Sequence, residues 1–147
     1  MNETIIAAKI VMANTFILYF KAHSFHWNVE GESFPQYHEF LGDFYEEVYG
    51  AIDTIAEEIR AMGEFAPRSI DELYKFKTIS DQNQAMGSRE MFMDLQNANS
   101  ATLDSLNKLF SMLTAANEQG FANFIADRIN AHKKHAWMLK SILKPGN

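Results

Sequence analysis

Two kinds of metal-binding side chain are concentrated between residues 26 and 57. His26 and His38 flank a short segment that contains Gly31, and Asp53 and Glu57 follow farther along the chain. A mixture of imidazole and carboxylate groups suits Fe(II) or Zn(II) better than a soft Cu(I) ion. The i, i+4 spacing of Asp53 and Glu57 places both carboxylates on one face of a helix. These four residues are therefore the candidate metal ligands.

The distance between the two pairs shows that one chain cannot bring all four groups to one ion. Asp53 follows His38 by 15 positions, which is roughly 22 Å along a helix axis. Metal–ligand bonds are only about 2 Å long. Two interpretations stay open: the pairs are unrelated, or two chains pack antiparallel about a two-fold axis. In the second case the histidines of one chain face the carboxylates of the other.

Four long stretches of the sequence carry apolar residues at helical spacing. We expect helices over about 3–29, 34–62, 88–116 and 121–143. Ser33 and Gln36 have capping-box spacing at the start of the second stretch, with Pro35 just inside it. Gly63 is a suitable stop for that helix, and Gln119–Gly120 is the expected break before the last one.

A second capping-box pattern, Ser69 with Glu72, predicts a short helix near 70–75 within the long middle connection. Four long helices with such a connection indicate an all-α protein, a ferritin-like four-helix bundle with a short helix between its second and third long helices. At 147 residues the chain is expected to form one domain over 1–147.

Composition excludes several classes of function. The chain has no cysteine, which rules out disulfides and thiolate metal sites and fits a cytoplasmic protein. Residues 1–20 are apolar but are interrupted by Glu3, Lys9 and Asn14, so we expect neither a signal peptide nor a membrane span. The net charge of −6 disfavours direct DNA binding, which depends on Lys and Arg neutralising phosphates.

Several motifs resemble those of the Dps mini-ferritins, the DNA-binding proteins from starved cells. They are HWNVEG, beginning at His26, then His38–Glu39, then DTIAEEIR, beginning at Asp53, with the spacing from His26 to Glu57 kept without an insertion. WML at 137–139 resembles the family's last helix. The resemblance covers nearly the whole chain.

The resemblance implies a protein that oxidises Fe(II) with hydrogen peroxide or oxygen and stores Fe(III) mineral, protecting the cell from oxidative damage. It implies a homododecamer whose ferroxidase sites lie at two-fold interfaces between subunits. The family roles carry over to His26, His38, Asp53 and Glu57 as iron ligands, with Glu57 bridging two irons. Trp27 is expected close to the metals, and zinc is a substitute for iron.

One ligand position departs from the family pattern. The family usually has a carboxylate four residues after the second histidine, where this chain has Gly42. Glu46, one helical turn farther on, is the candidate to compensate. If Glu46 does not replace the missing carboxylate, we expect ferroxidase activity to be weakened. The alternative to a ferroxidase is a cage that holds a single iron or zinc ion per site. His132 and His135, an i, i+3 pair without a nearby acid in the sequence, are weak metal candidates.

A third hypothesis is a helical interaction module without metal chemistry. It predicts that changing Asp53 and Glu57 to Ala alters stability without altering Fe(II) binding. Glu47 and its acidic neighbours are interpreted as a solvated helix face.

Overall fold

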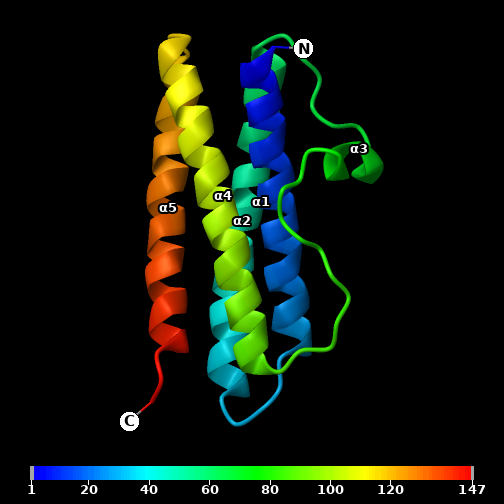
Figure 1. The fold of residues 1–147 in the computed structure, drawn as a ribbon, viewed down its shortest axis with the longest axis vertical. Helices are drawn as coiled ribbons and strands as arrows, with labels where there is room; N and C mark the ends of the chain where they lie inside the picture. The colour runs from blue at the N-terminus through cyan, green and yellow to red at the C-terminus, as the bar shows by residue number, and fades with distance from the viewer. Residues whose placement is uncertain (1, 147) are drawn as a thin grey trace.

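The structure, a computed structural model, describes residues 2–146, which form five helices and no strand (Figure 1). The helices are α1 (Glu3–Asn28), α2 (Phe34–Ala61), α3 (Ile70–Tyr74), α4 (Ser88–Ala115) and α5 (Gln119–Leu143). The predicted fold class, an all-α bundle with a short helix in its long connection, is confirmed, and helix ends differ from expectation by two residues at most.

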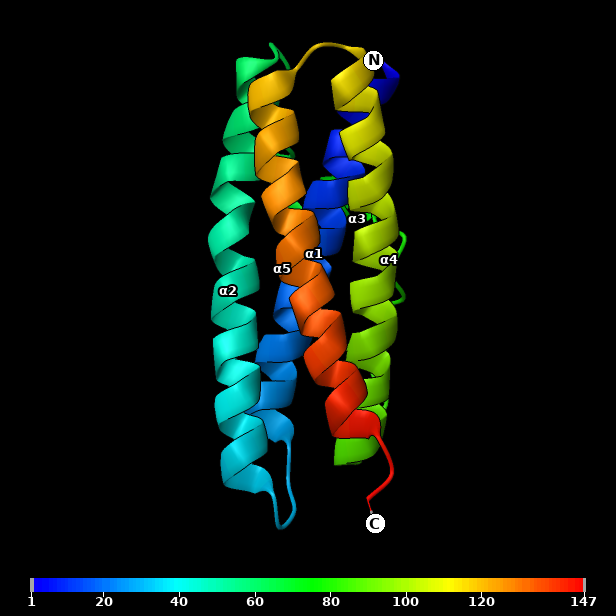
Figure 2. The same ribbon diagram turned by 90° about the vertical axis from the view of Figure 1, so that its left-hand side faces the viewer.

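The bundle consists of two antiparallel hairpins. α1 pairs with α2, and α4 pairs with α5. The connection over residues 62–87 runs the length of the bundle on the α1 side, so α4 runs in the same direction as α2 (Figure 1). α1 packs against both α2 and α4, whereas α2 and α5 lie side by side with few contacts (Figure 2).

Apolar side chains of the four long helices fill the interior in two clusters, one toward each end of the bundle. Burial of these side chains is the main stabilising contribution to the fold. The largest fully buried side chains include Phe44, Phe92, Phe121, Leu18, Leu41, Ile55, Ile59, Leu95, Leu106, Leu109, Leu113 and Ile125.

α1 is apolar over most of its surface. By length and composition alone it is the one helix, within residues 2–146, that could cross a membrane, and 67% of its most apolar window is buried inside the bundle. A core helix satisfies the same criterion. Its outward side carries exposed aromatic residues, among them Phe20 and Trp27.

Two buried polar residues of α1 tie the long connection and α4 to the bundle. The Asn14 Oδ1 atom accepts a hydrogen bond from the Thr78 backbone N–H (2.8 Å), and its amide nitrogen donates to the Thr78 hydroxyl (2.8 Å). The Lys21 ammonium group forms an ion pair with Asp94 of α4 (2.8 Å). Each satisfies a group that would be costly to bury alone.

The capping boxes predicted at the starts of α2 and α3 are only partly confirmed. Ser33 lies at the start of α2 as predicted, but its side chain makes no capping hydrogen bond, so the proposed capping box with Gln36 is wrong. Ser69 caps α3 by accepting from the Glu72 N–H (3.1 Å). Glu72 in turn accepts from the Arg68 N–H, one residue earlier than a capping box requires.

The break before the last helix also lies earlier than predicted. Gln119 and Gly120 are the first residues of α5, and the chain reverses at Asn117, which has a φ of 58°. Asn adopts this left-handed conformation more readily than most residues. Gly63 ends α2 with a φ of +92°, as expected for a glycine stop.

Candidate functional site

His26 and His38 form a closely stacked pair at the end of the α1–α2 hairpin. Their ring centroids are 3.7 Å apart and their planes differ by 14°. The Nδ1–H of each ring donates to the backbone carbonyl of the other residue, at 2.7 Å in both cases. These bonds place the proton of the uncharged imidazole on Nδ1, and Nε2 is then the nitrogen that can bind a metal.

A short turn places the two rings opposite each other. α1 ends at Asn28, and the buried Val29 turns the chain into extended backbone. Gly31 then adopts a φ of +119°, a conformation that other residues rarely take. Because only five residues lie between α1 and α2, the last turn of α1 meets the second turn of α2.

Gly42 leaves the space that the His26 ring occupies. A Cβ atom built at Gly42 would lie 3.2 Å from Cε1 and 3.3 Å from Nδ1 of His26. Both distances are shorter than ordinary van der Waals contact, so any larger residue requires the ring to shift by a few tenths of an ångström. The missing carboxylate and the position of the His26 ring are therefore linked.

Asp53 and Glu57 lie on an exposed face of α2, far from the histidine pair of the same chain. At 1.5 Å per residue, His38 and Asp53 are roughly 22 Å apart along the helix. Within residues 2–146, no group of three or more His, Asp or Glu side chains is close enough to hold a metal ion. The two candidate ligand pairs therefore lie apart on one chain. Glu46 is also exposed on α2, roughly 12 Å from His38 along the axis.

His23, one turn before His26, belongs to an aromatic cluster beside the histidine pair. Its ring stacks on Tyr45 with centroids 3.8 Å apart and contacts Trp27 at 4.2 Å. Burial, followed by the electrostatic interaction with His26, lowers the pKa of His23. Trp27 is 55% exposed and lies outside the bundle core.

A second polar cluster connects α2, α4 and α5 and was not predicted from the sequence. Glu47 accepts two hydrogen bonds from the Arg128 guanidinium group and one from the His135 Nε2–H at 2.8 Å. Burial raises the pKa of Glu47, but the bonds from His135 and Arg128 and the Arg128 charge outweigh it and lower the pKa well below normal. The Glu47 side chain is still 40% exposed, as expected for a solvated face, but it also pairs with Arg128 and His135, which was not predicted.

His132 extends this cluster to α4. Its Nε2 accepts from Arg128 (3.1 Å), and its Nδ1–H donates to the Asn99 side chain (2.9 Å). Burial, followed by the charges of Arg128 and His135, holds the pKa of His132 well below its usual value. We call Glu47, Asn99, Arg128, His132 and His135 the Glu47 network. Its signal in the sequence was the i, i+4 spacing of Arg128 and His132.

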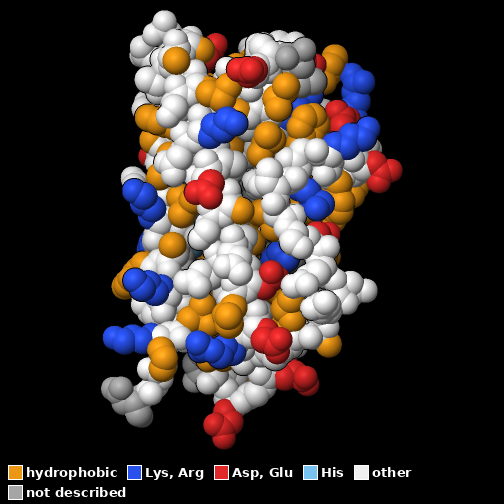
Figure 3. All heavy atoms as spheres, in the orientation of Figure 1, with side chains coloured by type: hydrophobic (Ala, Val, Ile, Leu, Met, Phe, Trp, Pro, Cys, Tyr) orange, Lys and Arg blue, Asp and Glu red, His pale blue; other side chains and the backbone are white. Residues whose placement is uncertain are grey.

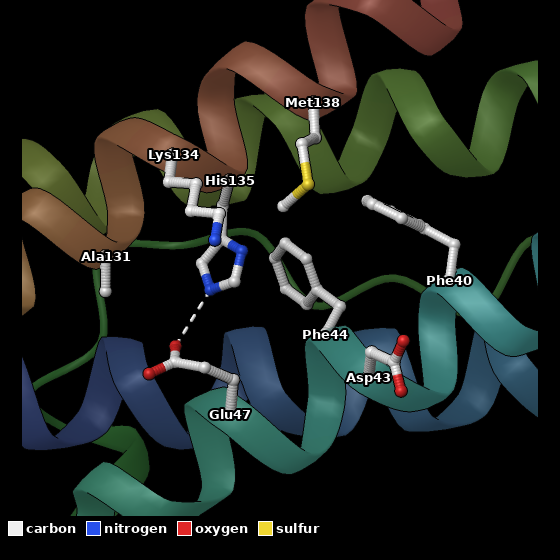
Figure 4. Close-up of a pocket in the computed structure, with 8 residues that line it drawn as sticks. All are labelled: Phe40, Asp43, Phe44, Glu47, Ala131, Lys134, His135 and Met138. Atoms are coloured by element: carbon white, nitrogen blue, oxygen red, sulfur yellow. Dashed lines mark hydrogen bonds and ion pairs between the residues drawn. The ribbon is translucent and has the colours of Figure 1, made fainter.

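A cavity of about 440 Å³ opens beside this network, between α2 and α5 (Figure 4). Phe40, Phe44 and Met138 form its apolar side, and Lys134 lies near its His135 side. Among residues 2–146, the buried Nδ1 atom of His135 has no hydrogen-bond partner. The cavity lies where α2 and α5 make few contacts.

Comparison with known proteins assigns the fold. A ferritin-like domain model matches residues 9–146. A DNA protection during starvation protein of Brevibacillus brevis is 30% identical over 134 residues, which cover 90% of this chain and 89% of that protein. The chain belongs to the Dps family.

Two solved structures are similar to this Dps-family chain. The crystal structure of a Dps protein from Bacillus brevis is 27% identical, with a TM-score of 0.88 and coverage of 98% of this chain and 100% of that one. A Dps protein from Vibrio cholerae O1, described as a member of the ferritin-like diiron-carboxylate superfamily, is 22% identical with a TM-score of 0.91 over 97% and 89% of the two chains. The second likeness supports the fold alone.

Membership of the family indicates an iron-related protective role for this chain.

Proposed function

We propose that this protein is an iron-sequestering mini-ferritin that oxidises Fe(II) at sites completed by two chains. Hydrogen peroxide or oxygen is the oxidant, and the Fe(III) product is stored as mineral inside a homododecamer in the cytoplasm. The main observation behind this proposal is that the two candidate ligand pairs lie far apart on one chain. The His26–His38 pair is roughly 22 Å along α2 from the exposed carboxylates of Asp53 and Glu57.

Antiparallel pairing about a two-fold axis explains this separation. His38, Tyr49, Asp53 and Glu57 lie along one side of α2, because they follow each other at steps close to whole turns. Two such helices packed antiparallel bring the histidines of each chain to the carboxylates of the other, and symmetry gives two equivalent sites. The axis then passes near Glu46, which lies away from both sites and is a poor replacement for the missing ligand.

The ligand chemistry supports iron oxidation. The free Nε2 atoms of the histidine pair suit one Fe(II), and the carboxylate oxygens of Asp53 and Glu57 tolerate both Fe(II) and Fe(III). With Glu57 bridging, two Fe(II) ions can give one electron each to hydrogen peroxide, which with two protons yields two water molecules. Consumption of both Fe(II) and peroxide suppresses hydroxyl radical formation. Zinc fits the same ligands without redox chemistry.

Direct DNA binding is not part of the proposal. The net charge is −6, and the face in Figure 3 interrupts its basic side chains with acidic and neutral ones. Protection of DNA is then indirect, through removal of iron and peroxide.

A mixing experiment tests whether the sites are shared. One variant carries His26→Ala and His38→Ala, and the other carries Asp53→Ala and Glu57→Ala. Each alone is expected to be inactive in stopped-flow Fe(II) oxidation. In a mixed pair, one site receives both intact halves, so random mixing restores about one quarter of the sites. The absence of any recovery, with mixed assembly shown by mass spectrometry, would refute shared sites.

The single-metal alternative rests on Gly42, which supplies no carboxylate. Anaerobic titration with Fe(II) distinguishes the two hypotheses. Two Fe(II) ions per site support the ferroxidase, and one ion per site supports the cage with a single metal ion. If the Asp53→Ala/Glu57→Ala variant binds Fe(II) as wild type does, the helical interaction module is the remaining hypothesis.

A further inference from the structure

The cavity of about 440 Å³ between α2 and α5 is lined by residues that the proposed iron chemistry does not use. Small-molecule sites in proteins commonly measure about 300–1,000 Å³, and a few polar groups orient the ligand against a mostly apolar wall. The cavity combines both kinds of group, which are Phe40, Phe44, Ala131 and Met138 on the apolar side and Asp43, Glu47, Lys134 and His135 on the polar side (Figure 4). Its size and composition therefore suit a small organic molecule.

The buried ring of His135 directs a polar atom into this cavity. Its side chain is only 6% exposed, and its Nε2–H donates to the Glu47 carboxylate at 2.8 Å. In the part of the chain that the structure describes, residues 2–146, its Nδ1 has no hydrogen-bond partner. Figure 4 shows this nitrogen on the side of the ring that faces Phe44 and Met138. A buried polar atom without a partner is costly, so a ligand that bonds to Nδ1 is stabilised there.

The bond to Glu47 determines what His135 can offer to a ligand. The hydrogen bonds from His135 and Arg128 hold the pKa of Glu47 well below its usual value despite its partial burial, so the carboxylate is ionised and only accepts. The proton of the uncharged imidazole therefore lies on Nε2, and Nδ1 carries a free lone pair. The ligand group beside Nδ1 must then be a donor, which excludes ionised carboxylates and phosphates as the preferred partners.

The charges of the lining favour a neutral ligand. Glu47 is paired with Arg128, which leaves Asp43 and Lys134 as opposite charges in the wall of the cavity. These two charges offset each other, and any charge placed against the apolar side loses its hydration. A neutral hydroxyl group meets both conditions, because it donates to Nδ1 and needs no counter-charge. A phenolic hydroxyl is more acidic than that of an aliphatic alcohol and is the stronger donor of the two.

The apolar side of the cavity is suited to a flat ring. The Phe44 ring lies 4.3 Å from the His135 ring between centroids, with planes 42° apart, and Phe40 lies 6.1 Å from Phe44. Aromatic rings pack well against one another in tilted and edge-to-face arrangements, and a methionine sulfur contacts ring edges favourably. An aromatic ligand therefore contacts Phe40, Phe44 and Met138 better than an aliphatic one does.

We propose that this cavity binds a small neutral phenol-type ligand, an aromatic ring whose hydroxyl group donates to Nδ1 of His135. The site is separate from the proposed iron centre. Phe44 precedes Asp53 by about two and a half helical turns, so the two side chains lie on opposite sides of α2. Pairing of two chains through the Asp53 side therefore leaves the cavity open, and the ligand and the iron ions occupy the protein independently.

Methyl NMR of the assembled, iron-free protein tests the proposal with phenol as the probe. The methionine methyl groups are isotope-labelled, and the Met138 signal is identified by its loss in Met138→Leu. Phenol should shift the Met138 signal saturably and leave unchanged the signal of Met93, an exposed residue of α4 outside the cavity. Anisole has a similar ring but no donor, so it should need a concentration at least about fivefold higher. Equal binding of phenol and anisole, or tighter binding of benzoate, overturns the proposal.

Two substitutions separate the hydrogen bond from the shape of the cavity. His135→Leu removes Nδ1, so the preference for phenol over anisole should fall to about one, whereas a variant that only loosens the fold weakens both ligands and keeps their ratio. Ala131→Leu fills the cavity and should abolish the shift, and Ala136→Leu, on α5 but outside the cavity, should retain it. A preference that survives in His135→Leu, or a shift that survives in Ala131→Leu, overturns the proposal. Because no iron enters these measurements, such a result leaves the proposed function intact.

Discussion

Replacing Gly42 with Asp should rebuild the second iron position. The variant returns a carboxylate one helical turn after His38, where the family usually has one. Asp is a slightly better helix residue than Gly, by about 0.3 kcal/mol. That gain is offset because the new Cβ lies 3.2 Å from the His26 ring and must displace it slightly. We therefore expect stability within about 0.5 kcal/mol of wild type.

The effect on iron should be larger than the effect on folding. A carboxylate added to an incomplete site should tighten the weaker Fe(II) position about tenfold or more, which is about 1.4 kcal/mol or more. Anaerobic Fe(II) titration, followed by stopped-flow oxidation with peroxide, measures this directly. The stoichiometry should rise toward two ions per site.

Gly42→Ala is the matched control, since it introduces the same Cβ without a carboxylate. It should gain up to about 1 kcal/mol in helix propensity, less the cost of moving His26, and leave the iron stoichiometry unchanged. If Gly42→Asp binds no more iron than Gly42→Ala, an open ligand position at Gly42 is not what limits the site. The reasoning that links this glycine to a weakened centre is then refuted.

Three further predictions concern stability and nucleic acid. Glu47→Gln removes the charge that pairs with the buried Arg128, so it should lower the free energy of unfolding in urea by about 1–3 kcal/mol. The control Glu46→Gln, on the same helix, should change the free energy of unfolding by less than about 0.5 kcal/mol. Equal effects of the two substitutions would contradict the stabilising role of the Glu47 network. His132 has a folded pKa well below its unfolded value, so the unfolded state binds the proton first and stability should fall below about pH 6.5, by up to about 1.4 kcal/mol per pH unit. His132→Gln should flatten this dependence of the free energy of unfolding on pH. An unchanged slope would show that the titration of His132 does not cause it. The assembled protein should give no shift in a gel mobility assay with duplex DNA at about 0.15 M salt, and a salt-sensitive shift would contradict the electrostatic argument.

Helix positions could be predicted from the sequence because they depend on local periodicity. The apolar spacing that predicted α1, α2, α4 and α5 depends only on residues within each helix. The Gly63 stop and the Ser69 cap are local in the same way. The failures were local competitions between alternatives. Ser33 starts α2 without capping it, and Asn117 takes the reversal that Gly120 was expected to make.

The candidate ligands could be named from spacing and resemblance, but the Glu47 network could not. Glu47 and Arg128 are 81 positions apart, and Glu47 and His135 are 88 apart. A single sequence does not indicate which acid on α2 faces which base on α5. The Tyr19–His23 hydrogen bond is different, because its i, i+4 spacing on α1 is visible in the sequence. What the spacing did not reveal is that Tyr45 would stack on the same imidazole.

The outward side of the α1–α2 hairpin limits how this protein can exist on its own. Three aromatic side chains on this side are largely exposed: Phe20 (46%), Trp27 (55%) and Tyr49 (58%). An isolated subunit therefore has a hydrophobic aromatic patch in contact with water. Disrupting the pairing of chains should therefore yield precipitate rather than well-behaved single subunits. Anyone who wants a soluble monomer must replace these rings with charged side chains, and will disturb the surroundings of the histidines in doing so.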